Sequence, residues 1–166
     1  MRKAMAVVAA LLLVGCVSRP DPDPAVMRQG PPPWEAPRDA ISYIREAGLP
    51  ELALDEDGDP FIVAMEVAVD GTPVSLPPFI GVDRLRAVQA PAHTHDDTGD
   101  LWLEGEGNRE VTLGQFFTLW GVRFDGDCLA AACGGVEVRA DGVLVEEPVD
   151  LVLRGHERIQ VRAESE

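Results

Sequence analysis

Alternation of apolar and polar positions marks the most regular segment of the chain. From Phe61 to Val69 every second residue is apolar, which places these side chains on one face of a half-buried strand. Asp70-Gly71 comes next, and this dipeptide favours a two-residue hairpin turn. The prolines at positions 73, 77 and 78 limit backbone pairing, so the return strand is predicted to lie at a sheet edge.

A helical spacing of apolar residues appears after Val111. Thr112 and Gln115 form the T-x-x-Q pattern of a capping box, and Gly121 stands where a glycine commonly ends a helix. Between them lies an apolar stripe, which predicts a core helix: Leu113, Phe116, Phe117 and Trp120. A shorter helix is predicted over residues 39–47, before Gly48 and Pro50.

The remaining periodic segments are short and have the alternation of strands. They cover residues 100–104, 136–140, 143–145, 149–153 and 159–163, with a second Asp-Gly turn at 141–142. Strands joined by tight hairpins, together with one amphipathic helix, predict an α+β domain with a mostly antiparallel sheet and one short core helix. A β-grasp-like arrangement, in which the helix that starts at Thr112 crosses the sheet, is our specific expectation.

The first sixteen residues have the features of a lipoprotein leader. Arg2 and Lys3 precede an apolar run of about eleven residues, which is too short to span a bilayer but typical of a signal-peptide core. The run ends in Leu-Val-Gly-Cys16, the pattern of a lipobox, so residues 1–15 are predicted to be a signal peptide and Cys16 to be lipidated. An ordinary secretory signal followed by a chance cysteine is the alternative.

Residues 16–38 are predicted to form the lipidated cysteine and a disordered tether, because they are rich in Pro and Asp and have little apolar pattern. Residues 39–166 are then a single α+β domain. The expected location is the cell envelope, where the acyl chains anchor the protein to the extracytoplasmic side of a membrane.

Charge excludes some partners. Without Arg2 and Lys3 the chain has 12 basic residues, all Arg, against 29 acidic ones, a net charge of −17. Nucleic-acid binding depends on basic side chains that neutralise phosphates, so no nucleic-acid partner is expected. The membrane, through the lipid anchor, is the predicted partner, and the residues identify no protein or small-molecule partner.

Two cysteines remain for the folded domain. Cys128 and Cys133 form an even pair in a compartment that is expected to be oxidising, which favours a disulfide over metal ligation or free thiols.

Candidate chemistry concentrates in His93-Thr-His95-Asp-Asp97. Residues i and i+2 of an extended segment point the same way, so the two imidazoles can chelate Zn²⁺ or Cu²⁺ if a third ligand joins them. His156, the only other histidine, is the candidate third ligand, with the carboxylates as alternatives. The competing interpretation is a histidine pair hydrogen-bonded within a turn.

Three runs of sequence, AHTHDDTGDLWLEGEG (92–107), VTLGQFFTLWGVRF (111–124) and CLAAAC (128–133), resemble an uncharacterised family of secreted or lipid-anchored bacterial proteins with HTHD and TLGQFFxxWG motifs. Members usually carry an H-x-H-x-H run on the first long strand, where this chain has Phe61, Val63 and Met65. The resemblance therefore implies a reduced histidine cluster.

No catalytic signature accompanies these residues. The chain has no G-x-S-x-G motif and no phosphate-binding glycine loop. We therefore expect a non-catalytic binding or structural domain without a cofactor, and a zinc- or copper-binding module is the alternative function.

Overall fold

The computed structural model describes residues 20–54 and 59–166, and the predicted leader and the predicted lipidation of Cys16 lie outside this range. The described part is an α+β domain, as predicted. The larger of its two sheets has the strand order β6-β7-β2-β10-β8-β9, with β3 also paired to β2. The strands of this sheet are β2 Phe61–Val69, β3 Thr72–Val74, β6 Ala92–His93, β7 Asp100–Leu103, β8 Gly135–Ala140, β9 Val143–Leu144 and β10 Arg158–Glu164.

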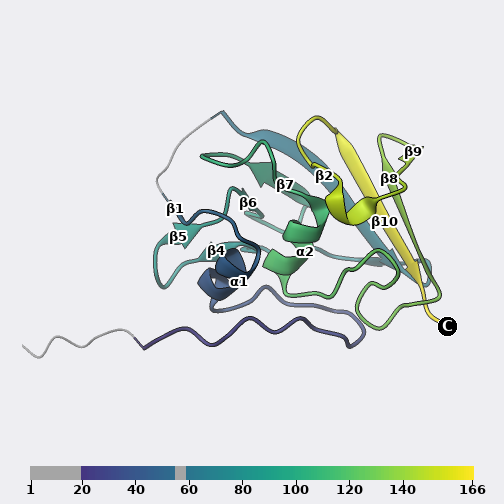
Figure 1. Ribbon diagram of the computed structural model, residues 1–166, viewed down its shortest axis with the longest axis horizontal. Coiled ribbons are helices and arrows are strands. Elements are labelled where there is room, and N and C mark those ends of the chain that lie inside the picture. Colours follow the sequence, from purple (N-terminus) through teal and green to yellow (C-terminus); the bar gives the residue numbers. More distant parts are fainter. Residues whose placement is uncertain (1–19, 55–58) are drawn as a thin grey trace, which may run out of the picture.

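The centre of this sheet is a parallel pair, whereas its other strand pairs are antiparallel. β2 and β10 run side by side with Met65 opposite Ile159 and Val67 opposite Val161. β3 lies on one side of this pair and β8 on the other, and the helix α2 (Leu113–Trp120) comes between the two hairpins in sequence. This order agrees with the β-grasp-like arrangement expected from the sequence (Figure 1).

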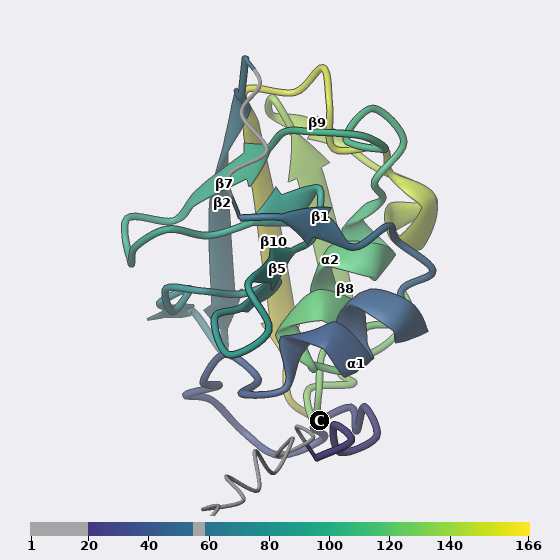
Figure 2. The ribbon, with the colours of Figure 1, turned by 90° about the vertical axis from the view of Figure 1, so that its left-hand side faces the viewer.

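Helix α2 covers one face of the sheet, and α1 (Ala40–Glu46) packs beside it, as Figure 2 shows. The capping box forms as predicted, because the Thr112 side chain accepts from the Gln115 N–H and the Gln115 side chain accepts from the Thr112 N–H. The four residues of the predicted apolar stripe are fully buried and form the centre of the core. A smaller sheet, β1-β5-β4, lies against α1; its strands are β1 Leu52–Ala53, β5 Val88–Gln89 and β4 Val82–Asp83.

Both Asp-Gly turns are two-residue hairpins. Asp70 and Gly71 have φ values of 51° and 71°, and Asp141 and Gly142 have values of 50° and 83°. Positive φ at both central residues matches the right-handed twist of the flanking strands, which explains why this dipeptide was a reliable signal.

The predicted strand over 149–153 is wrong. Pro148–Asp150 form a short 3₁₀ turn, η1, and Val152 makes only an isolated bridge to Thr112. Pro148 has no N–H to donate to a ladder, which favours the turn. Val149 instead packs closely against Gly114. A Cβ added at Gly114 would lie 2.7 Å from the Val149 side chain.

The segment that precedes α1 also differs from the expectation of a disordered tether through residue 38. Arg28 pairs with Val122 in a parallel bridge, and its backbone N–H donates to the Gly121 carbonyl. Trp34 is 3% exposed and packs edge-on against Trp120. This segment is polar in sequence but supplies one large apolar side chain to the core, so residues 28–38 are part of the folded domain.

Candidate metal site

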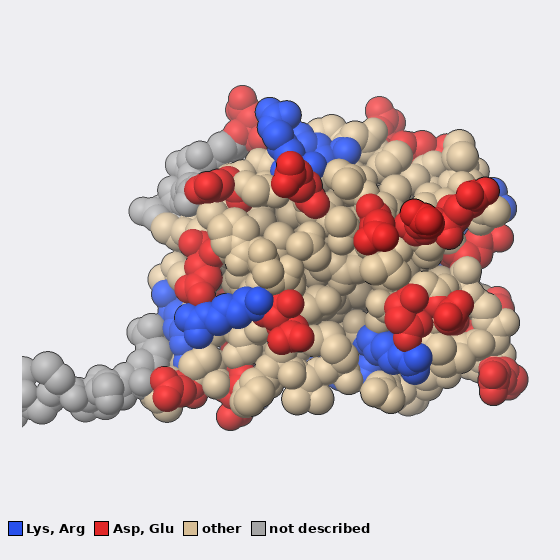
Figure 3. All heavy atoms as spheres, viewed as in Figure 1, with Lys and Arg blue, Asp and Glu red and all other residues tan. Residues whose placement is uncertain are grey.

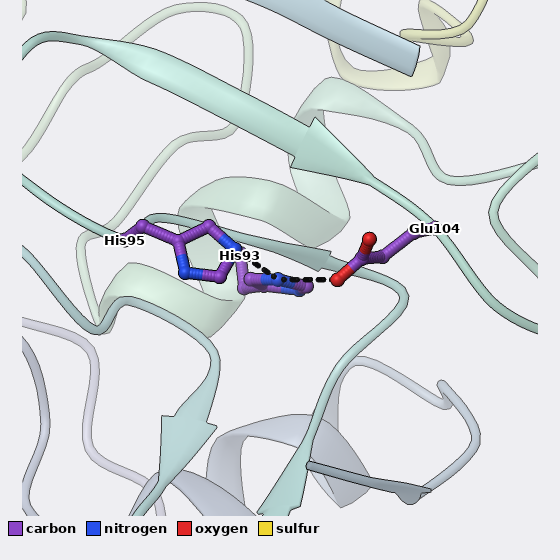
Figure 4. A group of neighbouring side chains, drawn as sticks. All are labelled: His93, His95 and Glu104. Atoms are coloured by element: carbon purple, nitrogen blue, oxygen red, sulfur yellow. Dashed lines mark hydrogen bonds and ion pairs between the residues drawn. The ribbon is translucent and has the colours of Figure 1, made fainter. Parts of the chain in front are cut away.

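Three potential metal ligands meet at one edge of the larger sheet. His93 ends β6, and β6 pairs with β7 so that His93 lies opposite Trp102. The next residue beyond β7 on this side is Glu104, whose backbone N–H donates to the Pro91 carbonyl. His95 follows His93 by two residues and points to the same side, as the i, i+2 spacing predicted (Figure 4).

The three donor atoms are close together. His93 Nε2 lies 3.2 Å from His95 Nε2 and 3.2 Å from Glu104 Oε1, and all three atoms lie within 4.8 Å of one another. Zinc binds imidazole nitrogen at about 2.0–2.1 Å, so two ligand atoms in a tetrahedral site are separated by about 3.3–3.4 Å. Two of the three separations are close to this value and the third is at most 4.8 Å, so small side-chain shifts would let all three atoms bind one tetrahedral cation and leave a fourth position open.

The tautomer of His93 follows from its surroundings. Its Nδ1 lies 2.9 Å from the Ala90 carbonyl, which can only accept, so Nδ1 carries the proton. Burial lowers the pKa of His93 and favours the neutral ring, although the Ala90 carbonyl and Glu104 oppose this effect. The Nε2 lone pair of neutral His93 then faces the site, as a metal-ligating histidine requires.

This arrangement favours a bound cation. A neutral His93 places its Nε2 lone pair 3.2 Å from Glu104 Oε1, and the His95 Nε2, also 3.2 Å away, can donate a hydrogen bond to this lone pair. A positive ion coordinated by both histidines and Glu104 would replace this hydrogen bond and place its charge beside the carboxylate.

Neighbouring groups hold the segment from Ala92 to His95, which carries both histidines, in place. Thr94 is fully buried, and its hydroxyl donates to the Pro77 carbonyl while accepting the Ile80 N–H. The Trp102 ring packs edge-on against His95, with the ring centres 4.7 Å apart. Gly81 packs so tightly on this strand that a Cβ would lie 2.6 Å from the Ala92 carbonyl. The backbone that presents His93 and His95 is therefore supported on both sides.

The structure does not bring His156 into this group, so its assignment as third ligand is wrong. His156 is half-buried at the start of the segment leading into β10, where its Nδ1 lies 2.9 Å from Asp141 Oδ2. Asp141 occupies the second hairpin turn, and its other oxygen accepts the Glu157 and Arg158 N–H groups. His156 thus stabilises a turn.

Sequence reasoning missed Glu104 as the specific third ligand, although it left carboxylates open as alternatives. The chain has 29 acidic residues, and none stands out by its local pattern. Only the pairing of β6 with β7 places Glu104 beside His93. Asp96, which follows His95 directly in the sequence, instead accepts hydrogen bonds from the Thr98 hydroxyl and N–H, and these hydrogen bonds lower the pKa of Asp96.

The predicted pairing of Cys128 with Cys133 is confirmed by the distance between the two residues. Cys128 and Cys133 are joined as a disulfide, with their Cα atoms 4.3 Å apart. The loop that they close follows Phe124 and covers one end of the core, where Leu129 and Ala130 are buried.

Comparison with known proteins gives no further assignment. No family model, no curated protein and no solved structure matches this chain. Within residues 20–54 and 59–166, no helix combines the length and apolar character that a membrane span needs. The family resemblance noted from the sequence therefore stays a prediction.

Proposed function

We propose that this protein is an extracytoplasmic lipoprotein whose domain binds a divalent transition-metal ion through His93, His95 and Glu104. Zn²⁺ is the first candidate for this ion. The observation that carries the proposal is the meeting of two imidazole nitrogens and one carboxylate oxygen within 4.8 Å. The sequence predicted His93, His95 and His156 as ligands, and the pairing of β6 with β7 supports Glu104 in place of His156.

The donor set favours zinc among the common cations. Two histidines and one carboxylate form a known three-ligand zinc set, whereas Ca²⁺ and Mg²⁺ prefer six or more oxygen ligands. Cu²⁺ binds nitrogen and oxygen ligands more tightly than Zn²⁺ in general but prefers a square-planar arrangement, so it is the second candidate. With three protein ligands the fourth position of the ion stays open to an exchangeable ligand, which supports binding and release of the metal as the function that we propose.

The membrane anchor is part of the same proposal. Arg2, Lys3, the short apolar run and the lipobox at Cys16 support export, acylation and attachment in the cell envelope. Anchoring by several acyl chains is stable without a transmembrane helix. Mass spectrometry of the protein purified from membranes tests this part, since an acylated N-terminal Cys16 is expected.

Isothermal titration calorimetry tests the metal proposal. Wild-type mature protein in detergent is titrated with Zn²⁺ and, separately, with Cu²⁺, beside the variants His95→Ala and Glu104→Gln. His95 is exposed, so its replacement spares the core. Substitution of a residue that only hydrogen-bonds to a metal ligand costs about 10–100-fold in metal affinity, and loss of a direct ligand is expected to cost at least that much.

The matched control is His156→Ala, which removes a histidine that pairs with a carboxylate elsewhere. This variant is expected to bind Zn²⁺ as the wild type does, with one ion per chain. A flat trace with wild-type protein overturns the metal proposal and leaves a purely structural or protein-binding domain.

A further inference from the structure

The folded domain begins very close to the predicted site of lipidation. The Pro20 carbonyl accepts a hydrogen bond of 3.0 Å from Arg86 Nη2. Only residues 17–19 separate Pro20 from Cys16. Since each residue spans at most about 3.3–3.6 Å, the Cα atoms of Cys16 and Pro20 can be no more than about 14 Å apart.

The exit point at Pro20 is held firmly on the domain. Arg86 is 10% exposed and pairs with Asp39 at 2.9 Å and with Asp83, which is fully buried, at 3.2 Å. Further along, the Asp23 carbonyl accepts from the Ser42 hydroxyl, and the Val26 backbone pairs with the Tyr43 hydroxyl. Acyl chains on Cys16 would therefore fix one end of the domain against the membrane instead of holding it out on a long tether.

The β4–β5 turn beside this exit point carries exposed apolar and basic side chains. The turn between β4 and β5 carries Arg86, which binds Pro20, and also Leu85, which is 63% exposed. Phe79 is 38% exposed, and the Arg84 guanidinium lies 4.8 Å above its ring centre. Arg38 lines the same groove of about 310 Å³. We call Arg38, Phe79, Arg84 and Leu85 the basal surface.

The charge of the basal surface differs from that of the whole domain. Arg38 and Arg84 line its groove against a single acidic residue, Glu35, whereas the mature chain has a net charge of −17. Figure 3 shows basic side chains in separate patches over this face of the molecule, each with acidic side chains beside it, so the excess of arginine is a local property of the groove. Arginine with exposed leucine and phenylalanine is the composition that rests at a lipid headgroup layer.

We propose that the basal surface lies against the phosphate headgroups of the membrane that carries the acyl chains of Cys16. The inference rests on the proposed lipid anchor. The acyl chains supply the membrane affinity, and the basal surface sets the orientation: Leu85 and Phe79 enter the headgroup layer and Arg38 and Arg84 pair with phosphates.

This orientation places the candidate metal site near the membrane. The Phe79 N–H donates to the carbonyl of Thr94, the residue between the two histidines, over 2.9 Å. The loop from Pro77 to Gly81 thus connects the basal surface directly to the segment that carries His93 and His95. Metal exchange would therefore take place close to the lipid surface.

Nitroxide labels on introduced cysteines test the orientation. Full-length lipoprotein with Leu85→Cys, or with Leu144→Cys as the matched control, is labelled with a maleimide nitroxide and reconstituted into phosphatidylethanolamine/phosphatidylglycerol vesicles. Leu144 is also exposed, at 55%, and lies on β9 at the far edge of the larger sheet (Figures 1 and 2). Neither substitution removes a buried side chain, so both variants are expected to fold.

Collisional relaxation by a water-soluble nickel chelate and by oxygen reports the depth of each label. The label at position 85 is expected to show several-fold less relaxation by nickel than the label at 144, together with more relaxation by oxygen. Equal exposure of both labels to nickel in acylated protein overturns the orientation and leaves the anchor and the metal site intact. Protein that mass spectrometry shows to lack acyl chains overturns the anchor and the orientation together.

Discussion

The indole N–H of Trp120 donates a hydrogen bond to the backbone carbonyl of Trp34 over 3.0 Å, although 86 positions separate them in sequence. The two rings pack edge-on with their centres 5.5 Å apart. Trp34 itself donates to the Gly30 carbonyl. A proline-rich segment is thereby attached to the core helix, and this contact makes the N-terminal segment part of the domain.

Replacement of Trp34 by alanine is expected to destabilise the domain by about 3–5 kcal/mol, because a buried aromatic side chain leaves a cavity against Trp120. Urea unfolding followed by circular dichroism measures the change. Trp34→Phe keeps a ring in the same space and should lose less. If Trp34→Ala unfolds at the same urea concentration as the wild type, residues 28–38 do not contribute to the fold.

Zinc is expected to raise the midpoint of thermal unfolding. At a free Zn²⁺ concentration of about 100 times the Kd, binding to the folded state adds about 2.7 kcal/mol, which corresponds to about 5–10 °C for a domain of this size. Differential scanning calorimetry should show this shift for wild-type protein and for His156→Ala. A shift of the same size in Glu104→Gln would exclude Glu104 from the ligands.

Asp70 is expected to make the stability depend on acid pH. The N–H and hydroxyl of Ser165 donate to its carboxylate and hold its pKa below the ordinary value. Because the folded-state pKa is depressed, this contribution is present above about pH 4, the unfolded-state value, and is lost as the pH falls through the folded-state pKa.

Asp70→Asn provides the test, since asparagine tolerates the positive φ of this turn. Chemical unfolding of both proteins is measured from pH 6 downward. The wild type should lose stability more steeply than the variant below about pH 4. Identical slopes for the two proteins would contradict the assignment.

The disulfide is expected to stabilise the domain by about 2 kcal/mol through the short loop that it closes. The double variant Cys128→Ala/Cys133→Ala should unfold at a lower denaturant concentration by that amount. Mass spectrometry of unreduced wild-type protein checks the bond itself, since one disulfide removes two hydrogens. Two alkylatable thiols in protein purified without reductant would refute it.

Much of the fold could be predicted because strong local patterns coincide with the final elements. The alternation in β2, the capping box of α2 and the two Asp-Gly turns are encoded within a few residues of each other. The strands that the sequence did not reveal, β1, β4, β5 and β6, have two residues each. A pair of residues is too short to show a period, so only tertiary pairing defines these strands.

The candidate site was predicted only in part for a related reason. His93 and His95 are close in sequence, and their i, i+2 spacing is a local signal. The position of Glu104 depends instead on the register between β6 and β7, which no local pattern determines. His156 was chosen for its chemistry alone, and the structure shows that chemistry used at the Asp141 turn.

The parallel pairing of β2 with β10 has a consequence for the order of folding. The central strand of the larger sheet is the last one in the chain, Arg158–Glu164, and its partner β2 begins almost a hundred residues earlier. The sheet therefore cannot close until residues 158–164 have been made, and contacts of such long range form slowly. Until β10 pairs with it, β2 has only its antiparallel neighbours β3 and β7, so formation of the parallel pair is expected to limit the rate at which the core is completed.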